Sequence, residues 1–444
     1  MRIARIICCC LVLALAFSPD LFAIGPGNIG NEVLSARGEG QAFVGVAGQN
    51  DDPMVGYLNP AALTNLKGTN LTLGGTWENL HPKYEDSSGN ITKGRSNDAG
   101  VPNFGITQSL LDGKLGTGLT VSSPYGMDTH WAADSPMRYV ATNSVLHMID
   151  ISPAVGYQVT SQWSIGAAAD YFNLFDATLE KNVNNTELNY ALSQGRSQAS
   201  LSDGDAKLSG TAANWGFHTG VMYQPNDKNA FGLTYHNKVV LNVNGSISLT
   251  GLSGYAAGLF GGSNFTTSAY TTLVIPQNIQ MGYAYKPTDK LTIEADTAWY
   301  DWYSQQDLNI RTPAVTDTTQ AQILAASSQQ MNYRDCWNFA TGANYKWTDK
   351  LQVRGGIWYE PWVQPEINWN PSLIDLTRYG ISVGAGYAFT SNISVDLAYT
   401  AVFTHNRSIG TDNVFVAADE VPAGTYKNFM NLVGLNINYK YGSK

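Results

Sequence analysis

The sequence predicts an all-β protein, a 14-stranded antiparallel transmembrane β-barrel with an N-terminal hatch, and three observations support this. First, segments of about ten residues alternate apolar and polar side chains. Residues 393–403, for example, place Val395 and Leu397 on one face and Ser394 and Asp396 on the other. Second, the connections between these segments are by turns very short and long. Third, the chain begins with a segment typical of secreted proteins. Together these features are typical of bacterial outer-membrane barrels.

The N-terminus has the pattern of a secretory signal peptide. Arg2 and Arg5 precede the apolar run Ile6–Phe17, and Ala23 offers a small residue for cleavage. We therefore expect residues 1–23 to be removed. A lipoprotein signal at Cys8–Cys10 is an alternative, but Ile6 and Ile7 stand before these cysteines where a small residue would be needed.

The composition fits a barrel better than a soluble or helical membrane protein. Only 14% of residues are charged, against about 25% in soluble domains, whereas the 24 Tyr and 11 Trp suit membrane interfaces. The mean hydropathy is −0.17, and no apolar run is long enough for a transmembrane helix. The formal charge of −9, without a basic run, argues against nucleic-acid binding. After cleavage only Cys336 remains, so no intramolecular disulfide is expected.

Two units are expected after the signal peptide. Residues 24–67 show no sustained alternation but contain apolar side chains such as Phe43, Val55 and Leu63. This composition favours a hatch folded into the barrel over a disordered leader. Residues 68–444 are expected to form the barrel.

The alternating segments give an even number of strands, as single-chain bacterial barrels require. Tight turns rich in Pro, Asp, Asn and Gly follow each even-numbered strand, and longer loops follow the odd-numbered ones. Since short turns face the periplasm, both termini are expected to be periplasmic. The expected strands are 69–78, 101–109, 114–123, 146–159, 162–174, 212–224, 229–240, 272–286, 290–303, 337–348, 350–360, 378–389, 393–403 and 429–441.

The two faces of these strands differ in charge. The outward sets are apolar, whereas five charged residues fall on inward positions, where they avoid the cost of about 2–4 kcal/mol for Arg at the lipid midplane. These side chains form either a hydrogen-bonded network that holds the barrel shape or part of a ligand path. The inward residues are Asp170, Glu294, Asp296, Arg354 and Asp396.

An ordered set of motifs resembles the long-chain fatty-acid transporter family of outer-membrane proteins, which includes importers of aromatic hydrocarbons. The set covers nearly the whole mature chain. It consists of Gly38-Glu39-Gly40-Gln41-Ala42-Phe43, Asn59-Pro60-Ala61-Ala62-Leu63, Pro124-Tyr125-Gly126-Met127, Ile275-Pro276-Gln277-Asn278-Ile279, Lys290-Leu291-Thr292-Ile293-Glu294-Ala295-Asp296, Asp301-Trp302, Val353-Arg354-Gly355-Gly356 and Gly384-Ala385-Gly386-Tyr387. The resemblance implies a fourteen-stranded barrel closed by an N-terminal hatch, in agreement with the strand count.

The resemblance also implies where function is located. Asn59, Pro60 and Ala61, with Phe43, match the hatch, where a rigid corner and a gate are compatible roles. The family's lateral exit lies at a kink in the third strand, which corresponds here to Pro124, Tyr125 and Gly126; the alternative is that Pro124 simply ends the strand. A first apolar groove is expected on the loop 249–270, unless that loop only packs on its neighbours. Its residues are Leu252, Tyr255, Leu259, Phe260 and Phe265.

The sequence thus indicates a monomeric channel in the bacterial outer membrane. We expect it to contact outer-membrane lipids and to pass long-chain fatty acids or other hydrophobic molecules, without a cofactor or metal. A structural or adhesin-like barrel, an importer of aromatic hydrocarbons and a hydrophilic porin are the alternatives, the last disfavoured by the hatch. The six histidines are scattered without a metal-site motif, and no catalytic constellation accompanies them, so an enzyme is not expected. Arg354 is the inward candidate for binding a ligand carboxylate.

Overall fold

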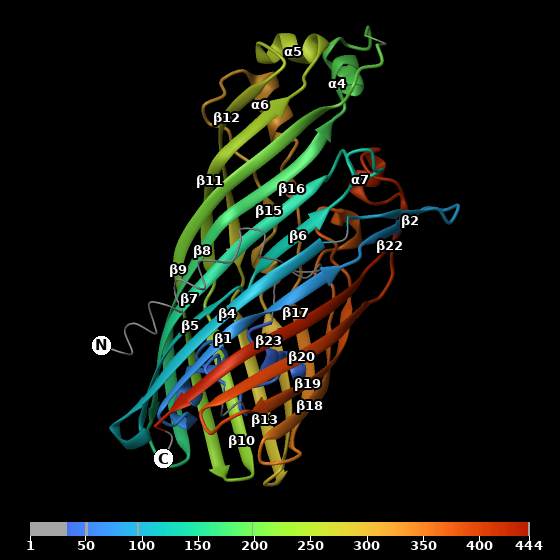
Figure 1. Cartoon of the computed structure of the whole chain (residues 1–444). Coiled ribbons are helices and arrows are strands. Elements are labelled where there is room, and N and C mark those ends of the chain that lie inside the picture. Colours follow the sequence, from blue (N-terminus) through green and yellow to red (C-terminus); the bar gives the residue numbers. More distant parts are fainter. Residues whose placement is uncertain (1–32, 49–51, 96, 198, 443–444) are drawn as a thin grey trace.

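Antiparallel strands form a closed barrel in the computed structural model of this chain, which describes residues 33–48, 52–95, 97–197 and 199–442 (Figure 1). The expected signal peptide and residues 24–32 of the expected hatch lie outside the described residues. The first and last barrel strands, β1 (Thr69–Leu80) and β23 (Phe429–Tyr441), pair along their whole length and close the barrel.

The strand prediction is confirmed, because the seventeen strands of this sheet form fourteen barrel strands, three of which are interrupted. The interrupted strands are β5 with β6, β10 with β11, and β12 with β13. Between β1 and β23 the barrel contains β4 (Asn97–Leu110), β5 (Leu115–Ser122), β6 (Gly126–His130), β7 (Asn143–Gln158), β8 (Trp163–Val183), β9 (Gly204–Asn226), β10 (Asn229–His236), β11 (Val239–Thr250), β12 (Phe265–Ile275), β13 (Asn278–Thr288), β14 (Leu291–Tyr300), β17 (Cys336–Lys346), β18 (Leu351–Glu360), β19 (Arg378–Ala388) and β20 (Ile393–Thr404).

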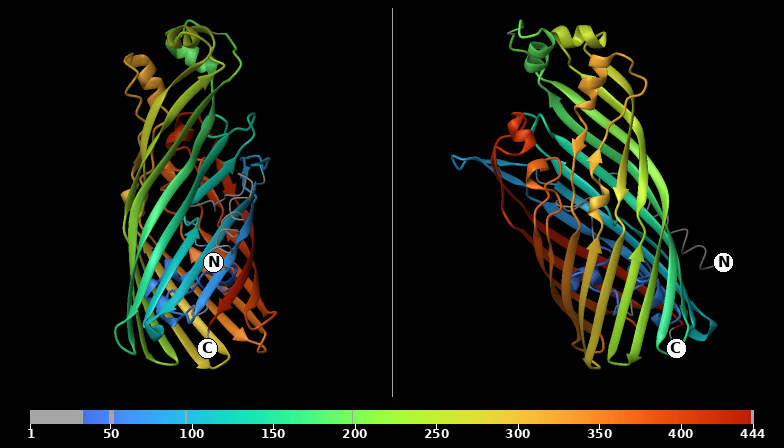
Figure 2. Two further views of the ribbon diagram at one scale, coloured as in Figure 1. Left: turned by 60° about the vertical axis from the view of Figure 1, so that its left-hand side comes forward. Right: turned by 180° about the vertical axis from the view of Figure 1, so that it is seen from behind.

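The two ends of the barrel differ. Tight turns, among them the 3-10 turn η2 (Leu111–Gly113), gather at the end where β23 finishes, and all longer connections lie at the other end (Figures 1 and 2). On one side, β8, β9, β11 and β12 rise well above the rest of the wall. The expected boundaries were wrong here: β8 continues to Val183 instead of 174, and β9 begins at Gly204 instead of 212.

The long connections fold into small structures. The helices α4 (Asn185–Leu192), α5 (Gly254–Phe260) and α6 (Thr318–Ala325) lie above the tall side (Figure 2). A second group stands over the lower side around buried Tyr426 and Trp369. The remaining elements are β2 (Lys83–Glu85), β3 (Ile91–Lys93), β21 (Arg407–Ile409), β22 (Gly424–Lys427), α7 (Val414–Ala417), β15 (Asp307–Leu308), β16 (Gln329–Gln330), η3 (Trp302–Ser304) and η4 (Glu366–Asn368).

The outer face of the barrel is apolar and aromatic, as the alternation predicts. Along β19 the outward side chains Tyr379, Ile381 and Val383 are about half exposed. Near the tight turns, Trp163 stacks on Tyr223 at 4.4 Å between ring centroids, one of the aromatic contacts expected at a membrane interface. No helix in the described part of the chain is both long and apolar enough to span a membrane.

The described residues before β1 fold inside the lower half of the barrel (Figure 1). We call the described residues 33–48 and 52–67 the hatch; they contain α2 (Ala36–Gly40), α3 (Val55–Leu58) and η1 (Pro60–Asn65). Most of the side chains of the hatch are buried. The hatch therefore fills the lumen at the end with the tight turns.

Glycines of the wall let the hatch backbone approach the strands directly. A Cβ at Gly166 would lie 2.3 Å from the carbonyl carbon of Pro60, and one at Gly342 would lie 2.1 Å from the carbonyl oxygen of Gln41. Such distances exclude any side chain at these positions. Other wall glycines that hatch backbone approaches in this way are Gly116, Gly156, Gly232 and Gly384, whereas at Gly105, Gly220 and Gly434 the nearest hatch atom belongs to a side chain. Together these glycines follow most of the circumference.

Candidate functional site

Asn59 is the corner of the hatch and also joins the hatch to the wall. It is fully buried and caps η1, because its side-chain oxygen accepts from the amide of Ala61. Its side-chain nitrogen donates to the carbonyl of Val46, 2.9 Å away in the hatch, and to that of Val221, 3.3 Å away in β9. Pro60 follows as the first residue of η1, where proline is favoured. The motif residues Asn59, Pro60 and Ala61 thus lie together at the hatch–wall contact.

Three of the five inward charged residues lie against the hatch, Arg354 reaches it through Asp396, and Asp170 reaches it through a histidine. Arg354 donates to Asp396 at 2.7 Å, and Arg37 of α2 lies 3.5 Å from the same carboxylate. Asp296 accepts from the amides of Gly45 at 2.7 Å and Val46 at 3.0 Å. These contacts make the inward charges anchors for the hatch as well as for the barrel.

The remaining two inward acids face different parts of the hatch. A Cβ built at Gly48 would overlap the Glu294 carboxylate at 1.9 Å, so this acid packs on the hatch backbone. Asp170 contacts His218, whose other ring nitrogen reaches the carbonyl of Gly56 in α3. Arg354 is not among the residues that line either of the two cavities described next.

Phe43 projects from a strained turn of the hatch. Ala42 and Phe43 both have positive φ, 61° and 64°, a region that non-glycine residues rarely adopt. The turn places the Phe43 ring edge-on to Trp358 of β18, with 5.9 Å between ring centroids. Strained backbone of this kind is common at functional sites.

A lower cavity of about 860 Å³ lies between the hatch and the wall. Phe43, Tyr57 and Leu58 of the hatch form its floor, and Pro124 and Tyr125 form part of its side. Its polar lining includes Asp296 and Glu360. Glu360 is paired with Arg378.

An upper cavity of about 910 Å³ lies above the first and is almost wholly apolar. Leucine, valine and methionine side chains of β6 to β9, β11 and β12 line it, together with residues of the connections above. Trp302 is fully buried and lines both cavities, so they adjoin at its ring. No lysine or arginine is among the lining residues of either cavity.

The third barrel strand is interrupted next to the lower cavity. Between the pairs Ser122↔Asp150 and Gly126↔His147, this strand has one residue more than β7, so it bulges and then resumes as β6. The ladder with β4 ends at Phe104↔Val121, and no pairing of β6 with β4 occurs in the described part of the chain. The wall therefore lacks a hydrogen-bonded seam between β4 and β6, beside Pro124 and Tyr125.

The apolar residues of the loop 249–270 mostly pack on one another. Leu252 and Phe260 are only 3% and 6% exposed, and the rings of Phe260 and Phe265 lie 4.9 Å apart. Leu259 packs against the same cluster, beside side chains of α4 and α6, and Tyr255 alone is largely exposed. Of the five residues expected in the groove only Tyr255 is thus largely exposed, because the loop and its neighbours form a core of their own.

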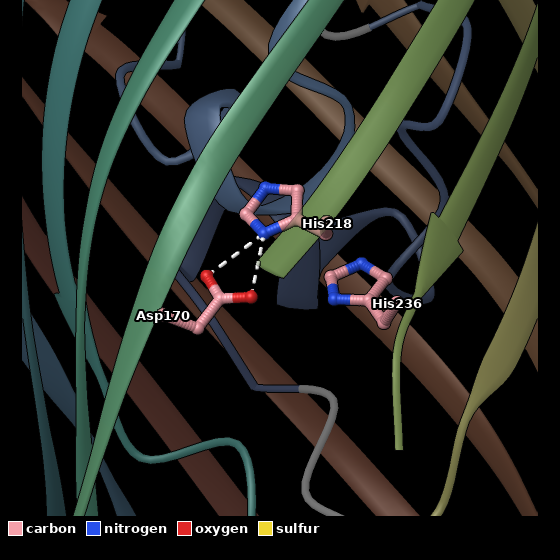
Figure 3. A group of neighbouring side chains, drawn as sticks. All are labelled: Asp170, His218 and His236. Atoms are coloured by element: carbon pink, nitrogen blue, oxygen red, sulfur yellow. Dashed lines mark hydrogen bonds and ion pairs between the residues drawn. The ribbon is translucent and has the colours of Figure 1, made fainter. Parts of the chain in front are cut away.

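A cluster of buried polar groups beneath α3 was missed by sequence reasoning. Asp170 of β8, His218 of β9 and His236 of β10 lie side by side (Figure 3), and their candidate ligand atoms are within 4.8 Å of one another. The imidazole rings are nearly parallel, at 16° and 4.5 Å between centroids. Metal–nitrogen bonds lie in the ring plane, so parallel rings do not converge on one ion without rotating. A simple hairpin around the turn 225–228 would place His218 opposite Tyr235, and the register shift between Asn229 and Phe231 brings it opposite His236 instead.

Known proteins similar to this chain are outer-membrane proteins. A family model described as "Outer membrane protein transport protein (OMPP1/FadL/TodX)" matches residues 27–441. The 47 kDa outer membrane protein of Pasteurella multocida is 27% identical over 433 residues, with 92% of each chain covered. The long-chain fatty acid transport protein of Salmonella typhi is 24% identical over 395 residues, covering 85% of this chain and 87% of that protein. A crystal structure of a Pseudomonas aeruginosa FadL homologue has the same fold, with a TM-score of 0.79 at 23% identity, covering 94% and 99% of the two chains.

Proposed function

This chain belongs to the OMPP1/FadL/TodX family of outer membrane transport proteins, and we propose that it carries long-chain fatty acids or molecules of similar hydrophobicity inward. In this proposal the signal peptide, residues 1–23, is removed, and the N-terminal unit of residues 24–67, to which the hatch belongs, closes the barrel of 68–444. Both termini are periplasmic. The protein acts as a monomer in contact with outer-membrane lipids, with no reaction and no cofactor.

The upper cavity is the observation that carries the proposal. Its lining is apolar over nearly the whole surface, as in pockets that bind hydrophobic ligands. Water in such a cavity would lack hydrogen-bonding partners, whereas an acyl chain would gain about 0.8 kcal/mol for each methylene buried. The lumen thus favours hydrophobic cargo over ions and sugars, which argues against a hydrophilic porin.

The cargo would pass from the upper to the lower cavity at Trp302 and leave where the wall lacks a seam between β4 and β6. Pro124 and Tyr125 line the lower cavity at this place, and Phe43, Tyr57 and Leu58 of the hatch lie opposite them. Movement of the hatch would enlarge the space beside the gap. The exposed Tyr255 of the loop 249–270 is available for a first contact with cargo.

Uptake of labelled oleate by cells with and without the protein tests the proposal. We expect faster uptake with the protein, and labelled toluene in parallel separates fatty acids from aromatic hydrocarbons as cargo. Equal uptake of both labels in the two strains would contradict transport and leave the adhesin-like barrel as the reading to pursue. Conductance in planar bilayers tests the porin alternative, because a large steady current would mean that the hatch does not close the lumen.

A further inference from the structure

Hydrogen bonds join the barrel wall to the hatch through one histidine. His218 is fully buried, and its Nε2 lies 2.9 Å from the carbonyl oxygen of Gly56 in α3. Its Nδ1 lies 2.8 and 3.0 Å from the two carboxylate oxygens of Asp170 (Figure 3). The imidazole therefore links Asp170 of β8 to the hatch.

The partners of His218 determine how many protons this link contains. A carbonyl oxygen only accepts, so Nε2 must carry a hydrogen and donate it to Gly56. A carboxylate also only accepts, so the contact at Nδ1 requires a second proton, on the ring or on the carboxyl. With that proton the imidazolium is charge-paired with Asp170. Without it, a nitrogen lone pair would face two acceptor oxygens, and the ring would have to turn away from Asp170 or from Gly56.

The groups around His218 allow only one positive charge at this place. From β10, His236 stacks on the ring at 4.5 Å, and two imidazolium rings at this distance would repel each other. From α3, Tyr57 contacts both rings, at 5.5 and 5.1 Å between centroids. From β7, Ser152 lies 2.5 Å from oxygens of both Asp170 and Asp150. The serine hydroxyl has a single hydrogen, so one of these carboxyl groups must supply the other.

This network also reaches the interruption of the third barrel strand. Asp150 is the residue of β7 that pairs with Ser122, the last residue of β5 before the bulge. The hydrogen bonds therefore run from the hatch at Gly56 to the strand next to the proposed exit. A change at His218 would act on both ends of the path.

Other hydrogen bonds between this part of the hatch and the wall involve neutral groups. Thr234 donates to the carbonyl of Leu58 at 2.9 Å, and Thr64 bonds Ser164 at 3.0 Å. Neither hydroxyl changes its protonation near neutral pH. The contact of His218 with Gly56 differs from these because a ring nitrogen can gain or lose a proton and so exist as donor or acceptor.

We propose that His218 is a positioning residue that holds α3 and η1 against the wall while it shares two protons with Gly56 and Asp170, and that loss of the second proton releases this part of the hatch. The role of this release in transport rests on the proposed function, since release would widen the space beside the missing seam between β4 and β6. The physical claim itself concerns only the docking of the hatch. Rising pH is therefore expected to loosen the segment from Val55 to Leu66.

Hydrogen exchange by mass spectrometry tests this claim on the full-length protein in nanodiscs. Protection factors of the amides of residues 55–66 are measured from about pH 5 to about pH 9, corrected for intrinsic exchange. In the wild type we expect protection to fall about tenfold or more with rising pH, the size expected for losing one hydrogen bond to a charged group. His218→Gln has no ionisable ring, so its protection is expected to be low and independent of pH.

Two further variants distinguish the effect of the second proton on His218 from the effect of losing a hydrogen bond between wall and hatch. In Asp170→Asn the amide donates to Nδ1 of a neutral ring, so the bond to Gly56 persists and protection stays high at every pH. Thr234→Val removes a neutral wall–hatch bond of the same length and should lower protection by a constant factor while keeping the pH step. A flat wild-type profile, or a step that survives in both His218→Gln and Asp170→Asn, would overturn the proposal. Exchange needs no cargo, so this outcome is independent of oleate uptake.

Discussion

Asn59 lies directly against the backbone of Gly220, so closely that a Cβ at position 220 would come within 2.1 Å of the Asn59 side-chain oxygen. The same Asn59 side chain caps η1 and bonds the carbonyls of Val46 and Val221. Position 220 therefore controls the corner of the hatch from the wall.

Replacing Gly220 with alanine should displace Asn59 and loosen the hatch. The new methyl group overlaps Asn59 and approaches Pro60 at 2.9 Å, and loss of the cap alone removes about 1 kcal/mol from the stability of η1. Single-channel recordings should show more frequent opening than in the wild type. Gly355→Ala is the control, since the nearest atom to its new Cβ is 3.6 Å away. Equal opening in the two variants would contradict the role given to Asn59.

Filling the upper cavity should slow uptake without weakening the barrel. Ala177 of β8 lines this cavity, and Ala177→Trp would occupy space that an acyl chain needs. We expect oleate uptake to fall several-fold at unchanged expression. Ala167→Trp adds the same side chain to the exposed face of the same strand and should leave uptake unchanged. If Ala177→Trp transports normally, the cargo does not pass through this cavity.

Removing the bulge in the third barrel strand should close the wall beside the lower cavity. Deletion of Pro124 equalises the residue count between this strand and β7, and it removes the residue that cannot donate to a ladder. Uptake should then fall. The less drastic Gly126→Val tests the same idea by stiffening the first residue of β6. Normal uptake in both variants, verified as folded by heat modifiability on gels, would argue against lateral exit here.

Arg354 should matter for stability and not for cargo affinity. Its guanidinium is 1% exposed and bonds the equally buried Asp396 at 2.7 Å. Arg354→Gln leaves a buried carboxylate short of its partner, which costs about 3–5 kcal/mol. Breaking the half-exposed pair of Lys207 with Glu180 by Lys207→Gln should cost under about 1 kcal/mol. Urea unfolding measures both costs, and a selective loss of oleate binding in Arg354→Gln at normal stability would restore it as a head-group partner.

Glu39 should make the docking of α2 depend on pH separately from His218. Burial in the hatch raises the pKa of Glu39 to about 8, although Thr76 donates to its carboxylate at 2.9 Å. Its ordinary pKa is about 4.3, so the docked hatch favours the protonated acid. Docking of α2 is thus strongest below that ordinary value and weakens as pH rises, until the loss is complete near pH 8. Hydrogen exchange of residues 36–40 should follow this course in the wild type and become flat in Glu39→Gln.

The sequence predicted the strand count well because each tight turn and each alternating segment is a local signal. It did not predict the interruptions at 237–238 and 276–277, although Pro276 inside an expected strand was a usable sign. It also ended β8 too early and began β9 too late. Where strands rise above the membrane, no lipid face enforces alternation, so the pattern fades while the ladder continues.

Long-range contacts account for what could not be predicted at the site. The inward position of Asp170 followed from alternation, but its contact with His218 requires the register between two strands joined by a long loop. The apolar loop 249–270 could not be assigned from its composition, because the helices that cover it come from elsewhere in the chain. Local patterns identified the strands and the hatch motif. The packing of the hatch against the wall depends on tertiary contacts between distant parts of the chain, which local patterns do not contain.

The glycine contacts around the circumference have a mechanical consequence for the moving part. Where the hatch meets main chain, the matching surface has no rotamers, so it has the same shape before and after the hatch leaves. A displaced hatch would therefore rebind to a wall surface of unchanged shape, because no wall side chain has to rearrange at these points. The wall would then need little reorganisation when the hatch opens and closes repeatedly. The rate of opening would be determined by the few polar side-chain contacts between hatch and wall.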